Sequence, residues 1–151
     1  TMHTTYKTLK DVYITNRPPA KISNLELEAL KFLENQPEGI VLTLPFDKQE
    51  AEEAISNPPR PLYAYESTAY VSAFTGKQVF LEDEVNLDIT GFTWQTRREE
   101  IEKYFDNPNN EFLSKNNIKY VYLAGDRAQN YHKLGLEMIY DSESVKILKH
   151  D

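Results

Sequence analysis

Three consecutive carboxylates, Glu82, Asp83 and Glu84, form the longest unbroken run of acidic side chains in the sequence. They lie at the end of "QVFLED", 78–83, which has the composition of a β-strand. Ligands of open α/β sheets bind beyond the carboxyl ends of the strands, so these carboxylates suit a Mg²⁺ or Ca²⁺ ion or an acid/base pair. Their spacing matches no calcium-binding loop. We therefore favour a solvated acidic turn, with a metal site as the alternative.

A second group lies in "TWQTRREEIEKYF", 93–105, where two arginines, Arg97 and Arg98, occupy positions in an apolar stripe at helical spacing. At least one guanidinium is expected on the inward side of this helix. It also lies in the first turn, where the helix dipole disfavours a cation. Such a cation needs a carboxylate or a bound anion as compensation. We expect an Arg–carboxylate clamp with Glu66 or Asp83, and the alternative is anion or sugar-phosphate binding.

The Thr-Gly-Lys at 75–77 suggests a phosphate-binding loop, but its surroundings do not fit a Walker A motif. Val71 stands where the motif has its first glycine, and Gln78 stands where it has Ser or Thr. Gly76 also follows the helix expected over 67–75, whereas a phosphate loop precedes its helix. We therefore expect Gly76 to end this helix. One face of the helix is small, which favours tight packing over space for a ligand: Ala69, Ser72, Ala73 and Gly76.

Composition excludes several classes of function. The net charge of −7 and the lack of a basic stripe argue against nucleic acid as a partner. Without cysteine there is no disulfide, thiolate zinc site or cysteine nucleophile. No apolar run reaches the length of a membrane span, no signal peptide is visible, and no cofactor motif is present. Because the chain begins Thr-Met-His, we expect it to be a piece of a longer protein.

The elements that must position these groups alternate between helix and strand. Residues 1–22 are expected to be a lead-in segment or linker, and 23–151 a single domain. Capping boxes predict helix starts at Ser23 and Thr96. Strands are expected at 39–46, 62–65, 78–83 and 118–125, and helices at 24–35, 67–75, 96–105 and 111–116. This order predicts an α/β fold: a two-layer or three-layer sandwich with a mostly parallel central sheet and a C-terminal antiparallel hairpin around "DSES".

The order of four segments resembles a known family. These segments are "LEALKFLENQPEGIVLTLP", "LYAYESTAYVSAFTGKQVFLEDE", "TGFTWQTRREEIEKYF" and "FLSKNNIKYVYLAG". Together, over roughly residues 24–125, they resemble the C-terminal extracytoplasmic soluble domain of polytopic bacterial membrane proteins of the GT-C glycosyltransferase-like class. Five residues occupy motif positions of that pattern: Ser72, Thr75, Gly76, Trp94 and Arg97.

The resemblance implies an accessory role. The parent would be an integral membrane protein that uses a lipid-linked sugar donor, with its catalytic carboxylate in an early loop outside this chain. The present domain would lie on the extracytoplasmic face and bind glycan or acceptor, or cap the membrane core, without being catalytic itself. This chain departs from such a parent because it contains no membrane span.

Two alternatives remain from the residues themselves. One is a small metal-assisted enzyme that uses the carboxylates at 82–84, and the other is a protein-interaction domain with a tyrosine-rich surface. The candidate ligand-binding residues combine the groups above: Glu66, Ser72, Thr75, Asp83, Trp94, Arg97 and Arg98.

Overall fold

A computed structural model describes residues 20–151, apart from the side chains at 130 and 131. Most of the expected lead-in, 1–19, lies outside the described residues. Its last part forms β1 (Ala20–Lys21), which pairs in parallel with β3 (Arg60–Pro61). The described chain is mixed α/β, as expected from the alternation of helix and strand signals. None of its helices has the length and apolar character needed to cross a bilayer.

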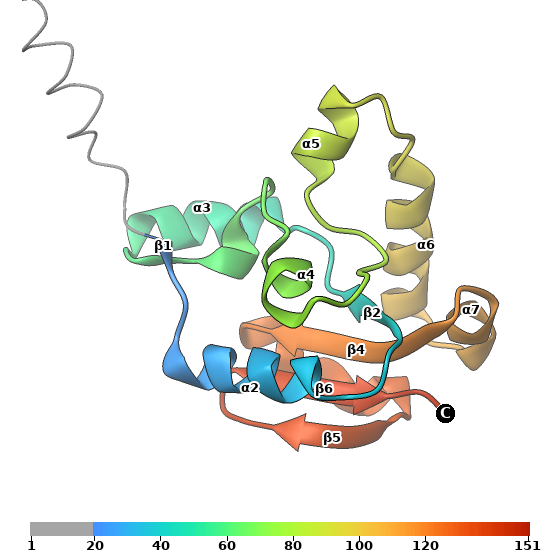
Figure 1. Ribbon diagram of the computed structural model, residues 1–151. Helices are drawn as coiled ribbons and strands as arrows, with labels where there is room; N and C mark the ends of the chain where they lie inside the picture. The colour runs from blue at the N-terminus through green and yellow to red at the C-terminus, as the bar shows by residue number, and fades with distance from the viewer. Residues whose placement is uncertain (1–19) are drawn as a thin grey trace, which may run out of the picture.

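A four-stranded sheet forms the centre of the fold (Figure 1). Its order is β2 (Ile40–Thr43), β4 (Ile118–Ala124), β6 (Val145–Lys149) and β5 (Glu137–Asp141). β2 and β4 are parallel, whereas β6 is antiparallel to both β4 and β5. The sheet is therefore mixed, and its parallel part lies at the β2 side.

Two expected strands take other forms. The segment at 78–83 reaches the sheet through one parallel bridge, Val79 to Val41, because the chain turns away after Phe80. "LYAY", 62–65, forms the 3₁₀ helix η1 (Leu62–Ala64) instead of a strand. Pro61 and the carbonyl of Leu62 set this short turn, since the backbone N–H of Tyr65 donates to that carbonyl at 3.1 Å.

Each face of the sheet is covered by helices. On one face α2 (Asn24–Glu34) and α4 (Tyr70–Thr75) pack on side chains of β2, β4 and β6. On the other face α6 (Gln95–Asp106) and α7 (Asn110–Lys115) pack on the opposite side chains of the same three strands. β4 serves both cores, with Tyr120 and Tyr122 in the first and Val121 and Leu123 in the second. β4 is therefore the strand around which the domain is built.

The two capping boxes have different outcomes. At α2 the Ser23 side chain accepts from the N–H of Glu26 at 3.1 Å, as expected for an N-cap. The Glu26 carboxylate, however, is buried beneath the helix. At α6 the prediction for Thr96 is wrong, because the helix has already begun at Gln95 and no side chain caps it.

Gly76 ends α4 in the left-handed conformation, with φ of 66°, as predicted. The next residue, Lys77, is 3% exposed, and its ammonium donates to the carbonyls of Gln36 at 2.7 Å and Pro37 at 3.3 Å. A cation is favourable there because these carbonyls follow the C-terminal end of α2. The Thr-Gly-Lys segment therefore has a structural role: it ends α4, leads the chain to the edge of the sheet, and binds the end of α2 through Lys77.

Three further elements surround the carboxyl ends of β2 and β4. α3 (Lys48–Ser56) follows β2, with Asp47 as its N-cap. α5 (Glu84–Ile89) extends away from the sheet in Figure 1. The 3₁₀ helix η2 (Asp126–Leu134) follows β4 through Gly125.

Candidate functional site

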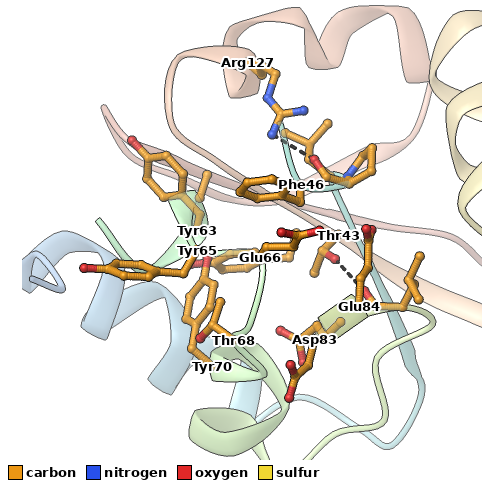
Figure 2. A pocket seen from close by; sticks show the side chains of 16 residues that line it. Thr43, Phe46, Tyr63, Tyr65, Glu66, Thr68, Tyr70, Asp83, Glu84 and Arg127 are labelled. Carbon is orange, nitrogen blue, oxygen red and sulfur yellow. Dashed lines mark hydrogen bonds between the residues drawn. The ribbon is translucent and has the colours of Figure 1, made fainter. Parts of the chain in front are cut away.

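A narrow cavity lies beyond the carboxyl ends of β2 and β4, where an α/β sheet offers a ligand position. We call it the inner pocket; its volume is about 60 Å³, enough for a few water molecules or one small polar group. Aromatic rings and acidic groups face each other across it (Figure 2). Its lining is Thr43, Leu44, Pro45, Phe46, Tyr63, Tyr65, Glu66, Thr68, Tyr70, Leu81, Glu82, Asp83, Glu84, Tyr122, Ala124 and Arg127.

A larger depression adjoins it, which we call the outer groove. It measures about 570 Å³ and lies between α3, β3 and the start of α6. Three residues line both spaces, namely Phe46, Glu66 and Glu84. The full lining of the outer groove is Phe46, Lys48, Ala51, Glu52, Ile55, Arg60, Glu66, Glu84, Trp94 and Arg98. Its size suits a small organic ligand, whereas the inner pocket alone does not.

The three consecutive carboxylates are held by three different sets of partners. Glu82 accepts from the backbone N–H groups of Val71 at 2.9 Å and Ser72 at 3.1 Å. Burial raises the pKa of Glu82, and these hydrogen bonds oppose the rise. Asp83 adopts φ of 55° and caps α5, accepting from the backbone of Asn86 at 3.4 Å and from its side chain at 2.7 Å.

Glu84 forms the third arrangement. It is 4% exposed and pairs with Arg98, whose Nη1 lies 2.6 Å from Oε2. Desolvation raises the pKa of Glu84, and Arg98 acts in the opposite direction. Within the described residues, no three Asp, Glu, His or Cys side chains are arranged to hold a metal ion. The metal-assisted alternative therefore gains no support from this strand end.

Arg98 is the clamp that the apolar stripe of α6 predicted, but its partners differ from those expected. It bonds Glu84, Glu102 at 2.8 Å and the carbonyl of Phe46 at 2.7 Å. Glu66 and Asp83 were the wrong partners, because Asp83 turns toward α5 and Glu66 forms no hydrogen bond or ion pair with another described residue. Sequence spacing predicts that Arg98 needs a compensating carboxylate, but it does not predict which element of the fold supplies that carboxylate.

The remaining motif residues lie outside both spaces. Ser72 donates to the carbonyl of Ala69 at 3.0 Å, and Thr75 donates to that of Val71 at 2.7 Å. Arg97 donates to the carbonyl of Phe80 at 3.0 Å, and its guanidinium lies 5.2 Å from the ring centres of Phe80 and Phe92. Ser72 and Arg97 instead line a separate cleft of about 360 Å³ beside α5, and Asp83 lines both this cleft and the inner pocket. Glu66, Trp94 and Arg98 are thus the candidates that the fold brings to the outer groove.

Two N–H donors of the outer groove have no acceptor among the described residues. They are Nε of Arg60 and Nε1 of Trp94, and both atoms are shielded from solvent. The Arg60 guanidinium stacks 4.0 Å above the ring of Tyr65, and its Nη2 donates to the carbonyl of Ala64. Sequence reasoning did not identify Arg60, which lies among the prolines of the segment 57–61.

A buried carboxyl, that of Glu26, lies behind the inner pocket together with the hydroxyls of Tyr70 and Tyr122. Glu26 is 4% exposed, and the hydroxyl of Tyr122 donates to it at 3.3 Å. Tyr70 also interacts with Glu26, and burial raises the pKa of Glu26. Burial raises the pKa of Tyr122 as well, so this hydroxyl stays protonated as a donor. In the sequence Glu26 stood out only as the last residue of the capping box at Ser23, and no sequence signal marked it as buried.

The far wall of the inner pocket depends on a close approach at Gly125. A Cβ at this position would lie 2.9 Å from both Oε1 of Glu50 and Cζ of Tyr63. Glu50 pairs with Arg127 at 3.0 Å, and Arg127 also donates to the carbonyl of Pro45 at 3.0 Å. The glycine therefore lets α3, η1 and η2 meet at the end of β4.

No known protein family, curated protein or solved structure matches this chain.

Proposed function

We propose that this chain is a glycan-binding accessory domain, and that the outer groove with the inner pocket beneath it is its ligand site. The observation that carries the proposal is the composition of the outer groove. It combines the rings of Trp94 and Phe46 with an unengaged carboxylate, Glu66, and with two N–H donors that lack acceptors, in Arg60 and Trp94. These statements hold for the described residues.

A sugar ring suits this combination for physical reasons. Its hydroxyl groups donate and accept, so they can satisfy both the carboxylate of Glu66 and the N–H groups of Arg60 and Trp94. Its C–H faces pack on aromatic side chains, which offer a large apolar surface. The volume of about 570 Å³ lies in the range of small-molecule sites, and the inner pocket adds room for one projecting polar group.

The larger setting is also part of the proposal. The ordered segments between 24 and 125 resemble the extracytoplasmic domain of membrane glycosyltransferase-like proteins, so we place the domain on that face of a cell membrane, beside a polytopic parent. In this setting the membrane-embedded part of the parent catalyses the glycosyl transfer, and the present domain binds the glycan or the acceptor. Ile89, which is 76% exposed, and Phe92, 44% exposed, offer the apolar contact through which α5 meets the parent. The reading frame upstream of this chain is expected to encode several apolar segments of about 20 residues.

The binding test uses the single tryptophan as its reporter. Trp94 is the only tryptophan of the chain and lines the outer groove, so its indole N–H resonance and its fluorescence are single signals that respond to changes there. Titration with a panel of mono- and oligosaccharides is expected to shift the indole resonance in a saturable manner. Glu66→Gln is expected to weaken that binding about 10-fold, because the exposed carboxylate is a strong acceptor.

The matched control is Glu111→Gln. Glu111 is also an exposed carboxylate, lies on α7, and lines neither the inner pocket nor the outer groove. This variant is expected to bind like the unmodified chain. A panel that leaves the indole resonance unmoved at tens of millimolar sugar would falsify the glycan proposal.

A further inference from the structure

The three cations that line the outer groove differ in whether they have an ion-pair partner. Arg98 is neutralised by Glu84 and Glu102. Arg60 and Lys48, by contrast, form no ion pair with any described residue. The chain carries 24 acidic against 17 basic side chains, so carboxylates are abundant as partners. It is therefore unusual that Arg60 and Lys48, which line the same groove, both lack a carboxylate partner among the described residues.

Arg60 is also fixed in position. Its guanidinium lies on the Tyr65 ring, and its bond to the Ala64 carbonyl engages only one of the terminal nitrogens. The Nε–H remains without an acceptor and shielded from solvent, which is unfavourable for a polar group. A guanidinium that is already oriented loses little rotamer freedom on binding a carboxylate or phosphate, and it can bind either with two parallel hydrogen bonds.

We propose that the ligand of the outer groove is an acidic sugar, whose single carboxylate or phosphate is bound by Arg60 and Lys48. The inference rests on the proposed glycan-binding function and names its substrate class. Trp94 supplies a further donor to the same ligand through its unpartnered indole N–H. Both N–H groups are shielded from solvent in this structure, so this proposal requires that the side chains covering them move when the ligand binds.

The acidic residues of the groove limit the ligand to one anionic group. Glu52 and Glu66 line the same groove, and Glu84 lies beside Arg98. A polyanion would meet these carboxylates and be repelled. A sugar with one charged substituent avoids this, since its hydroxyls donate to the carboxylates while its anionic group reaches the cations.

The test compares four probes by NMR at the Trp94 indole: glucose, glucuronate, glucose 6-phosphate and inorganic phosphate. At least one charged sugar is expected to bind 10-fold or more tightly than glucose, and the preference is expected to shrink in 0.5 M NaCl. Whether glucuronate or glucose 6-phosphate is preferred identifies the anion as carboxylate or phosphate. The use of the full 151-residue chain keeps the groove as described.

Three variants locate the effect. Arg60→Met is expected to bring the affinity for the charged sugar down to that for glucose. Because Arg60 also belongs to the proposed glycan site, the readout is the ratio of the two affinities and not the affinity for glucose itself. Since Arg60 also holds the Ala64 carbonyl, Lys48→Met serves as a second variant at an exposed position, with an expected loss of about 3-fold. Lys31→Met removes the same charge from α2, outside the groove, and is expected to change nothing.

The outcomes separate the two proposals. If glucose, glucuronate and glucose 6-phosphate bind equally well, the acidic-sugar inference is overturned and the glycan function stands. If phosphate alone binds as tightly as glucose 6-phosphate and glucose does not bind, the cations form an anion site and the glycan function fails. If no probe moves the indole resonance, both proposals fail together.

Discussion

Glu26 shows how a single side chain connects the first helix with the floor of the candidate site. Its carboxylate lies beneath α2 and accepts from Tyr122, whose ring also lines the inner pocket. Burial disfavours the ionised form, so the pKa of Glu26 lies above its ordinary value. The folded protein therefore binds this proton more tightly than the unfolded chain does.

Replacing this carboxyl by an amide gives a prediction with a defined sign. As pH rises from about 4.5 to the raised folded value, the unfolded chain loses the proton first, so the native chain loses stability over that window. Glu26→Gln keeps an oxygen to accept from Tyr122 but carries no proton to lose. Its free energy of unfolding, relative to the native chain, is expected to increase through the window and then level off.

Urea denaturation from pH 4 to pH 8 measures this difference. The other buried acids titrate in both proteins and cancel. Glu28→Gln, an exposed position on the same helix, controls for the removal of one negative charge from α2. A Glu26→Gln difference that stays constant across the whole range would show that burial does not control this carboxyl.

At the level of residues, local signals were predictable and distant partners were not. Gly76 ends α4 because the signal for a helix stop is contained in a few neighbouring residues. The inward guanidinium at Arg98 was likewise visible from helical spacing. Its partner Glu84, however, lies 14 positions away at the start of α5, a helix whose position is set by tertiary packing. The same limit explains why Arg60 and the burial of Glu26 were missed.

At the level of elements, Arg98 links three segments that are distant in the sequence: α6, the start of α5 and the segment that follows β2. From α6 it reaches Glu84 at the start of α5 and the carbonyl of Phe46 after β2. Since Glu84 is almost fully buried, its charge depends on this partner. Glu84 and Phe46 both line the inner pocket and the outer groove, so the clamp sets the shape of the site.

Breaking the clamp is expected to cost stability in a non-additive way. Arg98→Met is expected to lower the free energy of unfolding by about 2–3 kcal/mol, because it leaves a buried carboxylate without its partner. The double variant with Glu84→Gln is expected to lose less than the sum of the two single losses. Glu102→Gln removes the exposed partner and is expected to cost under about 0.5 kcal/mol. Strict additivity at 84 and 98 would contradict a clamp.

The elements themselves were predicted with uneven success. α2, α4, α6, α7 and β4 follow from periodicity and from clear stop signals. The segment at 78–83 has the composition of a strand, yet only Val79 bridges β2, because Arg97 and the turn into α5 engage the chain from Phe80 onward. "LYAY" likewise has strand composition, but the turn set after Pro61 overrides it. Composition indicates what a segment favours, and packing decides what it forms.

At the level of the whole molecule, β6 is the strand that completes both cores. Val145 and Ile147 belong to the core under α2 and α4, and Leu148 belongs to the core under α6 and α7. All three are almost fully buried. β6 also lies between β4 and β5, so without it one side of β4 has no hydrogen-bonding partner.

A chain that ends at residue 135 is therefore expected not to fold. It lacks β5 and β6, and β4 would expose apolar side chains on two faces together with an open edge. Circular dichroism is expected to show no cooperative thermal transition, and the amide resonances to collapse into a narrow range. A chain ending at residue 150, which omits only exposed Asp151, is expected to fold normally. A cooperative transition in the shorter chain would mean that β2, β4 and their helices form an independent unit.

The α/β class was visible in the alternation of elements, while the mixed pairing of the sheet was not. Sequence gives the strands but not their neighbours, and β6 takes its place beside β4 because its apolar side chains complete both cores. The outer groove was even less accessible to prediction. It is assembled from α3, β3, the segment around Glu66 and the start of α6, which only the finished fold brings together.

The short ladder of β1 and β3 has a mechanical consequence. Ala20 and Lys21 pair with Arg60 and Pro61, and the chain continues from there directly to Tyr63, Tyr65 and Glu66. A tensile load applied to the chain ahead of Ala20 is transmitted in shear through this ladder to the wall of the site. Tension on that segment would thus act on the strand that carries Arg60, a residue that lines the outer groove.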